Sequence, residues 1–162
     1  MKHHCSRLSY ESTGYFSKIV TDYLVQADTV RPFFVHTPDI QGIKEAIAAR
    51  QSFQIPRMVL VKALEEQYAQ TATSALVQQQ IQSLLSEQTF TVVTAHQPNI
   101  FTGPLYFIFK ILHAIQLADI LKKEIPDLHF VPVYYMGSED ADLDELGQIH
   151  IDGQPLTWKT NQ

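Results

Sequence analysis

The sequence is poor in cysteine, in charge and in basic side chains, and each shortage excludes a class of protein. Cys5 is the sole cysteine of the 162 residues, so the chain has no internal disulfide framework of the kind found in small secreted domains. Charged residues make up 18%, and 17 acidic side chains outnumber 12 basic ones for a net charge of −5. That balance argues against a nucleic-acid binder that relies on a basic surface.

Long hydrophobic segments are also lacking. The first residues contain no apolar core of a signal peptide. The most apolar stretch, residues 100–121, is interrupted by Lys110, His113 and Asp119, which disfavours a membrane span. Because 45% of the residues are hydrophobic and 10% aromatic, the composition is that of a globular protein. We expect a cytoplasmic protein that binds neither membrane nor nucleic acid.

Residues 1–89 carry eight basic and eight acidic side chains and show the periodicity of helices. We predict a helix capped by Thr13 that extends to Leu24, and a second helix capped by Asp39 that ends before Pro56. Two more are predicted over residues 57–68 and 73–86, and residues 31–38 are expected to be extended between their prolines. We interpret residues 1–89 as a helical N-terminal region that packs on the core.

Residues 90–162 change to an alternation of strand and helix and hold the whole acidic surplus, with four basic and nine acidic side chains. Residues 90–95 and 130–136 read as strands buried on both faces, joined by a long helix after Pro104. Asp152-Gly153 is a favoured hairpin turn. The fold class is therefore α/β with a parallel sheet. Two parallel strands cannot cover themselves, so we expect either a partner or, preferably, the first part of a larger core.

The loop after the first strand is the first candidate site. It supplies the hydrogen-bonding side chains of His96, Gln97, Asn99 and Thr102, with Gly103 allowing close approach of the backbone to a ligand. In an open α/β sheet, ligands bind beyond the carboxyl ends of the strands, where a helix N-terminus favours anions. The loop contains neither the dinucleotide fingerprint nor a P-loop. The alternative is that Asn99 or Thr102 only caps the following helix.

Lys110 lies two turns into that helix and either reaches an anionic substrate or extends to solvent. Tyr106 is interpreted as a packing or surface group. The second candidate site is the acidic segment after the second strand, with Glu139, Asp140 and Asp142 as candidates for binding an amino group, sugar hydroxyls or a divalent metal. The EF-hand pattern fails in this segment, and we assign no metal ligands. The alternative there is a short helix with an acidic first turn, capped by Ser138.

Two separated segments, His96 to Tyr106 and Phe130 to Asp142, resemble the bacillithiol biosynthesis cysteine-adding enzymes. In that family a Thr-Gly-Pro-Leu-Tyr segment precedes a helix, and a Val-Pro-Val strand ends in a Glu-Asp-His-Asp segment. Departures are His96, where the family usually has Gln, Asn99 in place of Gly, and Ala141 in place of His.

The resemblance implies a Rossmann-like core similar to the nucleotidylyltransferases, of which residues 90–162 are the first part, and a later coiled coil that forms a homodimer. It also implies a ligase that adds cysteine to the amino group of glucosaminyl malate. Because amide formation needs an activated carboxylate, ATP or another nucleotide is expected on chemical grounds, and the sequence names no cofactor. The resemblance carries over to the matching positions, which are Gln97, Thr102, Gly103, Glu139, Asp140 and Asp142. Taken with the reading of the loop and helix, His96 and Asp140 are the expected catalytic residues. Substrate or nucleotide is expected to be bound by Gln97, Asn99, Thr102, Gly103, Lys110, Glu139 and Asp142. The chain alone is expected to be inactive.

Two other functions stay open at this point. One is nucleotidyl transfer, with His96 on the phosphates and Mg²⁺ on the acidic segment. The other is a non-catalytic assembly module whose exposed strand edge recruits a second chain.

Overall fold

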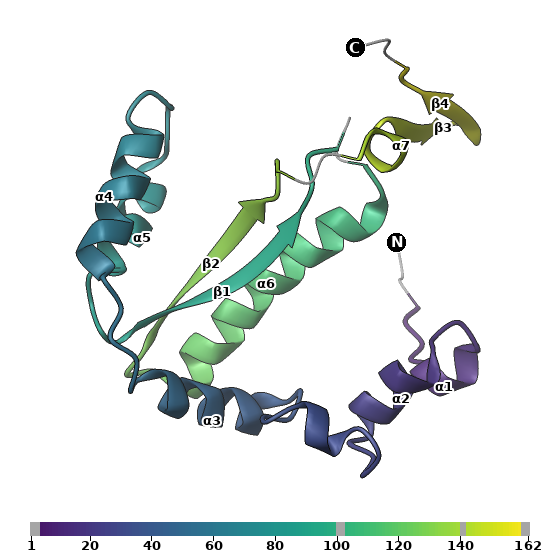
Figure 1. Cartoon of the computed structure of the whole chain (residues 1–162), viewed down its shortest axis with the longest axis horizontal. Coiled ribbons are helices and arrows are strands. Elements are labelled where there is room, and N and C mark those ends of the chain that lie inside the picture. The colour runs from purple at the N-terminus through teal and green to yellow at the C-terminus, as the bar shows by residue number, and fades with distance from the viewer. Residues whose placement is uncertain (1–3, 100–102, 140–141, 160–162) are drawn as a thin grey trace. The chain divides into compact units, whose positions relative to one another are not determined.

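The computed structural model describes residues 4–99, 103–139 and 142–159. It divides into two compact units, residues 1–54 and residues 55–162 (Figure 1). The division at residue 89 that charge and periodicity suggest stays a prediction, as does the packing of residues 1–89 on the core.

The first unit consists of short helices: α1 (Tyr10–Thr13), α2 (Lys18–Leu24), the 3-10 helix η1 (Arg31–Phe33) and α3 (Ile40–Arg50). The predicted helix start at Thr13 is wrong, because Thr13 ends α1 and Gly14 follows in the left-handed region with φ of 68°. The extended conformation predicted for residues 31–38 is wrong for η1, since Pro32 has the fixed φ that suits the first turn of a helix.

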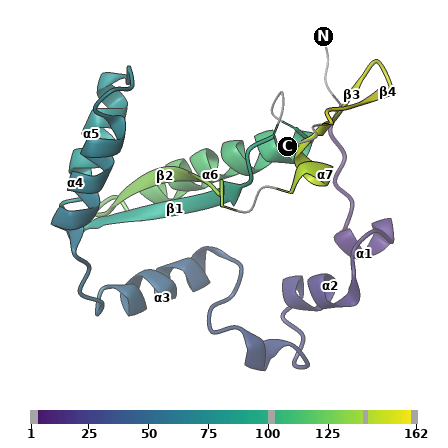
Figure 2. The ribbon, with the colours of Figure 1, turned by 45° about the horizontal axis from the view of Figure 1, so that its top comes forward.

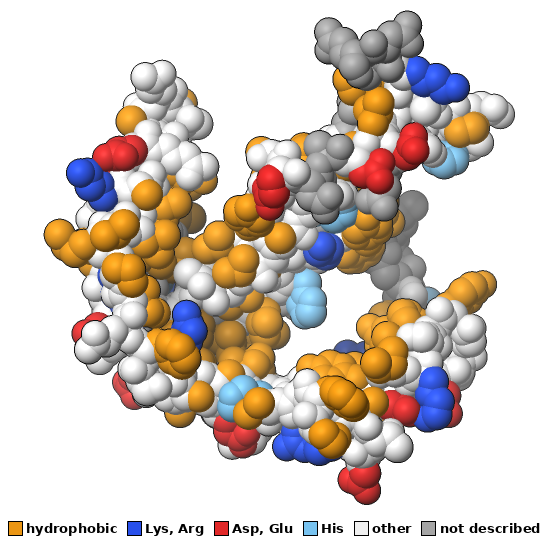
Figure 3. Space-filling model, viewed as in Figure 1, with side chains coloured by type: hydrophobic (Ala, Val, Ile, Leu, Met, Phe, Trp, Pro, Cys, Tyr) orange, Lys and Arg blue, Asp and Glu red, His pale blue; other side chains and the backbone are white. Residues whose placement is uncertain are grey.

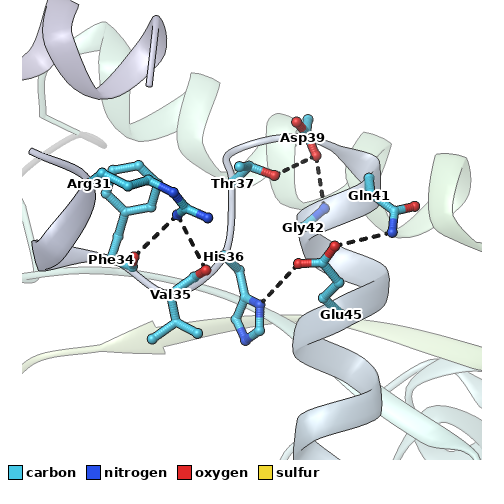
Figure 4. A network of polar contacts seen from close by, with 9 residues as sticks. All are labelled: Arg31, Phe34, Val35, His36, Thr37, Asp39, Gln41, Gly42 and Glu45. Carbon is cyan, nitrogen blue, oxygen red and sulfur yellow. Dashed lines mark hydrogen bonds and ion pairs between the residues drawn. The ribbon is translucent and has the colours of Figure 1, made fainter. Parts of the chain in front are cut away.

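Asp39 caps α3 as predicted, within the polar network shown in Figure 4. Its Oδ1 accepts hydrogen bonds from the backbone N–H of Gly42 at 2.8 Å and from the Thr37 hydroxyl at 2.9 Å. These bonds, the Gly42 one foremost, lower the pKa of the Asp39 carboxyl. Gly42 is required here, because a Cβ at this position would lie 2.1 Å from the carbonyl oxygen of Thr37.

The second unit begins with α4 (Arg57–Tyr68) and α5 (Ala75–Ser83), followed by β1 (Thr89–His96), α6 (Leu105–Glu124) and β2 (His129–Met136). It continues with α7 (Leu143–Leu146), β3 (Gln148–Ile151) and β4 (Gln154–Thr157). The predicted strand–helix–strand unit is confirmed, since β1 and β2 pair in parallel with Thr89 opposite His129 and His96 opposite Met136. The predicted hairpin is confirmed as well, with positive φ at Asp152 and Gly153.

The two faces of the β1–β2 sheet are covered differently. Helix α6 runs along one face (Figures 1 and 2), where the Phe107 and Tyr134 rings meet edge to face at 5.4 Å. On the other face Val131 joins a core made of Val61 from α4, Ile81 from α5 and Leu84 directly after α5. Beyond that core Val93 is 57% exposed, so the prediction that both strands are buried on both faces is wrong for this part of β1.

Large hydrophobic side chains remain on the surface of α6 as well (Figure 3), including Leu105, Phe109 and Leu112. Within the described part of the chain, no helix combines the length and apolarity needed to cross a membrane.

Candidate functional site

The ends of the two parallel strands meet at one edge of the sheet. The backbone N–H of Gly137 donates to the His96 carbonyl oxygen at 3.0 Å, and the Tyr134 hydroxyl donates to the same oxygen at 3.1 Å. These bonds join the loop after β1 to the turn after β2. A pocket of about 350 Å³ opens between them, lined by Ala95, His96, Gln97, Lys110, Tyr135, Gly137 and Glu139. The two candidate segments of the sequence therefore share one pocket.

Lys110 supplies the positive charge of this pocket. It reaches the carboxyl end of β1 from the second turn of α6, and its ammonium group donates a hydrogen bond to the Ala95 carbonyl oxygen. The side chain is exposed, so its remaining donors are available to an anionic group in the pocket. Sequence reasoning left open whether this side chain extends to solvent or to a site, and the structure places it in the pocket lining.

Glu139 supplies a negative charge on the β2 side of the same pocket. Its Oε1 accepts a hydrogen bond from the Tyr135 hydroxyl at 2.9 Å. This bond, with the nearby negative charge, raises the pKa of Tyr135 above the ordinary value, so Tyr135 stays a neutral donor. The neighbouring Tyr134 has its pKa raised by burial instead. In the described residues, Lys110 and Glu139 form no ion pair with each other, so each charge is available to a ligand.

His96 stands at the end of β1 in a set of short polar contacts. Its Nε2 lies 2.7 Å from the Tyr106 hydroxyl, and its Nδ1 lies 2.8 Å from the Asn99 amide nitrogen and 3.0 Å from the Gln97 carbonyl oxygen. The Phe107 ring meets the imidazole edge to face at 5.9 Å. Tyr106 was not expected to belong to this cluster, because it lies on the far side of the loop and no fixed spacing relates it to His96.

The other predicted site residues divide into three groups. Asn99 contacts His96, and Gly103 lies against the Asn99 side chain. Asp142 caps α7 by accepting from the Asp144 N–H at 2.9 Å, so the alternative in which Ser138 is the cap is wrong. The binding role of Asp142 stays a prediction. Ser138 lies in the turn between β2 and α7, where its backbone N–H donates to Met136. Thr102 and Asp140 lie outside the described residues.

The pocket has the groups for binding a molecule with both charges. Lys110 suits a carboxylate or phosphate, and Glu139 suits an ammonium group. Among residues 4–99, 103–139 and 142–159, no three His, Cys, Asp or Glu side chains lie close enough together to hold a metal ion.

Comparison with known proteins places the chain in a described family. The family model "Bacillithiol biosynthesis BshC, N-terminal Rossmann-like domain" matches residues 1–162. Two relatives named "Putative cysteine ligase BshC", from Flavobacterium psychrophilum and Cytophaga hutchinsonii, are each 40% identical over 156 residues, covering 94% and 96% of the chain. A third, from Chlorobaculum tepidum, is 34% identical over 135 residues.

The chain spans 29% and 30% of the lengths of the first two relatives. The family match confirms the predicted Rossmann-like fold class. It does not favour nucleotidyl transfer or a non-catalytic assembly module.

Proposed function

This chain belongs to the bacillithiol biosynthesis BshC family as its N-terminal Rossmann-like domain, and on that premise we propose that it is part of a cysteine ligase. The reaction joins the carboxyl carbon of cysteine to the amino nitrogen of glucosaminyl malate. Forming this amide requires an activated carboxylate, for which ATP or another nucleotide is the expected source of energy. A cytoplasmic location and a homodimer belong to the same proposal.

The observation that carries the proposal is the separation of charge in the pocket at the ends of β1 and β2. A cysteine molecule is a zwitterion, with an ammonium group and a carboxylate on one carbon. Lys110 and Glu139 line a single pocket of about 350 Å³ without pairing with each other, from α6 and from the turn after β2. We assign the substrate carboxylate to the Lys110 ammonium group and the substrate ammonium group to the Glu139 carboxylate.

Hydrogen bonds to neighbouring groups fix the positions of the Lys110 and Glu139 charges. Lys110 is oriented by its bond to the Ala95 carbonyl, and Glu139 by its bond from the neutral Tyr135 hydroxyl. Preorganised charges bind a complementary ligand more tightly, because less conformational freedom is lost on binding. The roles of His96 and Asp140 in the chemical step stay predictions.

Binding of three thiols to the full-length protein containing this chain tests the assignment. Cysteamine lacks the carboxylate of cysteine, and 3-mercaptopropionate lacks its ammonium group. We expect Lys110→Met to weaken cysteine binding about tenfold or more, equivalent to about 1.4 kcal/mol, and to leave cysteamine binding unchanged. Glu139→Gln is expected to weaken cysteine binding similarly and to leave 3-mercaptopropionate binding unchanged.

Two matched controls lie at the far end of α6. Lys122 and Glu124 are exposed and lie outside the pocket, so Lys122→Met and Glu124→Gln should leave all three affinities unchanged. Equal binding of cysteine and cysteamine by the unaltered protein would contradict the role of Lys110. Absence of the ligated product, measured by mass spectrometry with cysteine, glucosaminyl malate and ATP, would contradict the ligase proposal itself.

A further inference from the structure

The backbone hydrogen bonds between β1 and β2 show which residues of β1 face the partner strand. The Gln88 carbonyl oxygen accepts from the His129 N–H at 3.0 Å, and the His96 carbonyl oxygen accepts from the Gly137 N–H at 3.0 Å. Successive residues of a strand direct their backbone groups to opposite edges. The even-numbered residues of β1 therefore bond to β2, and the odd-numbered residues face the opposite side, which we call the outer edge of β1.

Cationic side chains close both ends of this outer edge. At the start of β1, Nη1 and Nη2 of Arg57 both donate to the Thr89 carbonyl oxygen at 3.2 Å, and the Thr89 N–H donates to the Ser86 carbonyl oxygen at 3.1 Å. At the end of β1, the Lys110 ammonium group donates to the Ala95 carbonyl oxygen. The outward carbonyl oxygens at both ends are therefore already paired.

Thr91 and Val93 lie between these two ends and leave the outer edge open. Within residues 4–99, 103–139 and 142–159, β1 pairs with β2 alone, and no backbone group outside β2 bonds to Thr91 or Val93. Both residues are exposed. Unpaired N–H and C=O groups in a row are a template on which a further strand can pair.

The outer edge of β2 is a poorer template, because a proline interrupts it. Odd-numbered residues of β2, such as His129, donate to β1, so the even-numbered residues face outward. Pro132 is one of them and has no N–H to donate. Proline is one of the features by which natural sheets discourage pairing at an edge. The unbroken row of donors is therefore on β1.

Among the strands of the described residues, none is available to fill the outer edge of β1. Strands β3 and β4 pair with each other, and the first unit consists of helices. The chain spans 29% and 30% of the lengths of the Flavobacterium psychrophilum and Cytophaga hutchinsonii relatives, so most of a full-length protein of this family lies outside the matched residues. We propose that a strand from that remaining part pairs with Thr91 and Val93 and makes β1 an interior strand of the sheet.

Lys110 limits where this added strand can run. Its bond occupies the Ala95 carbonyl oxygen, so the added strand pairs through Thr91 and Val93 and ends before the pocket, where Lys110 and Glu139 stay accessible to a ligand. The pairing does not depend on the ligase reaction, and its test requires no substrate.

Amide hydrogen exchange, measured at single residues in the full-length protein, tests this pairing. The amides of Val92 and Thr94 face β2 and serve as the internal reference. We expect the amides of Thr91 and Val93 to exchange at rates within about tenfold of this reference, because a paired amide exchanges only when the sheet opens. Exchange of Thr91 and Val93 more than about tenfold faster than the reference would show a free outer edge and overturn the proposal.

A proline variant of the full-length protein tests the same edge by its stability. At a free edge, Val93→Pro loses no hydrogen bond and should melt close to Val93→Thr, the matched control that keeps the N–H and the β-branched shape. We expect Val93→Pro to melt at a clearly lower temperature than Val93→Thr, since its N–H is lost from a paired ladder. Equal melting temperatures of the two variants would overturn the proposal.

Two measurements identify the occupant of the edge. We expect the exchange rates of Thr91 and Val93 to be independent of protein concentration, and sedimentation to give Val93→Pro the same mass as Val93→Thr, because the added strand belongs to the same molecule. Protection of Thr91 and Val93 that is lost on dilution, or a subunit lost from Val93→Pro alone, would assign the outer edge to a second copy and overturn the proposed occupant.

Discussion

Removing the Arg57 guanidinium should destabilise the second unit. Arg57 opens α4, and its Nη1 donates to the Leu84 carbonyl oxygen at 2.9 Å and to the Thr89 carbonyl oxygen at 3.2 Å. Nη2 donates to Thr89 as well, at 3.2 Å. Leu84 and Thr89 are 4% and 3% exposed, so water reaches both residues poorly. One side chain thus ties the start of α4 to the end of α5 and the start of β1.

The magnitude follows from these bonds. A hydrogen bond to a charged group contributes about 1.5–3 kcal/mol, and leaving a buried carbonyl without a partner costs about 1–3 kcal/mol. Because the guanidinium is only half-buried and the three bonds share two acceptors, we expect Arg57→Ala to lower the free energy of unfolding by about 2–4 kcal/mol. At about 2–4 °C per kcal/mol for a chain of this size, the melting temperature should fall by roughly 4–16 °C.

Thermal unfolding followed by circular dichroism measures this change, and hydrogen exchange locates it. The amides at the start of β1 should lose protection before those of α6. Arg57→Lys keeps the charge but not the planar fork of donors, so it should recover about half of the loss. Arg50→Ala is the control, because Arg50 only lies over the Phe53 ring at 4.6 Å, an exposed contact that contributes about 0.5–1 kcal/mol. A melting temperature of Arg57→Ala within 2 °C of the unaltered chain would refute this account, because about 1 kcal/mol is the most it leaves for all three bonds.

Two further predictions concern single groups. Glu139→Gln should lower the pKa of Tyr135 toward its ordinary value near 10, in an absorbance titration of the phenolates, and leave Tyr134 unchanged because burial alone raises its pKa. A raised pKa of Tyr135 in the folded state stabilises the fold at pH values below the ordinary tyrosine pKa, and this stabilisation is lost as the pH rises through the raised pKa. In Glu139→Gln the free energy of unfolding should therefore decline less steeply at alkaline pH. An unchanged Tyr135 titration would contradict the Glu139 contact. Gly42→Ala should lower the melting temperature, because the added methyl collides with the Thr37 backbone, even though alanine is the better helix former; a higher melting temperature would contradict the tight packing of Thr37 on α3.

Local patterns were sufficient for much of the fold. The helix predicted over residues 57–68 has those bounds in α4, because its apolar stripe and Pro56 define both face and start. The Asp39 cap and the Asp152-Gly153 turn depend on contacts between residues a few positions apart, which a sequence displays directly. The prediction that Thr13 caps a helix was wrong because the apolar pattern indicates one helix where the chain forms two short ones, α1 and α2, with Gly14 between them.

The meeting of the two candidate segments was predictable for a topological reason. Parallel strands joined by a helix carry their carboxyl ends to one edge, so His96 and Glu139 had to lie near each other once β1 and β2 paired. The Tyr106 contact was not predictable in this way. It depends on the approach of Tyr106, in the first turn of α6, to His96 at the end of β1, and on Asn99 fitting against Gly103 at a positive φ. The capping role of Asp142 was hidden for a similar reason, since an acidic residue before a short helix fits a cap and a ligand equally well.

The charge distribution of the chain bears on which ligands the pocket can take. The whole net charge of −5 falls on residues 90–162, the region that also contributes the pocket. A free anion approaching this region is therefore repelled over a distance of about 8 Å at physiological salt, and the short-range donors of Lys110 favour it inside the pocket. An amino acid has no net charge and escapes that repulsion, while its two charged groups still find Lys110 and Glu139 within the pocket. Capture of a zwitterion is thus the binding mode that the acidic surplus and the local geometry both permit, which agrees with the cysteine proposed above as the ligand.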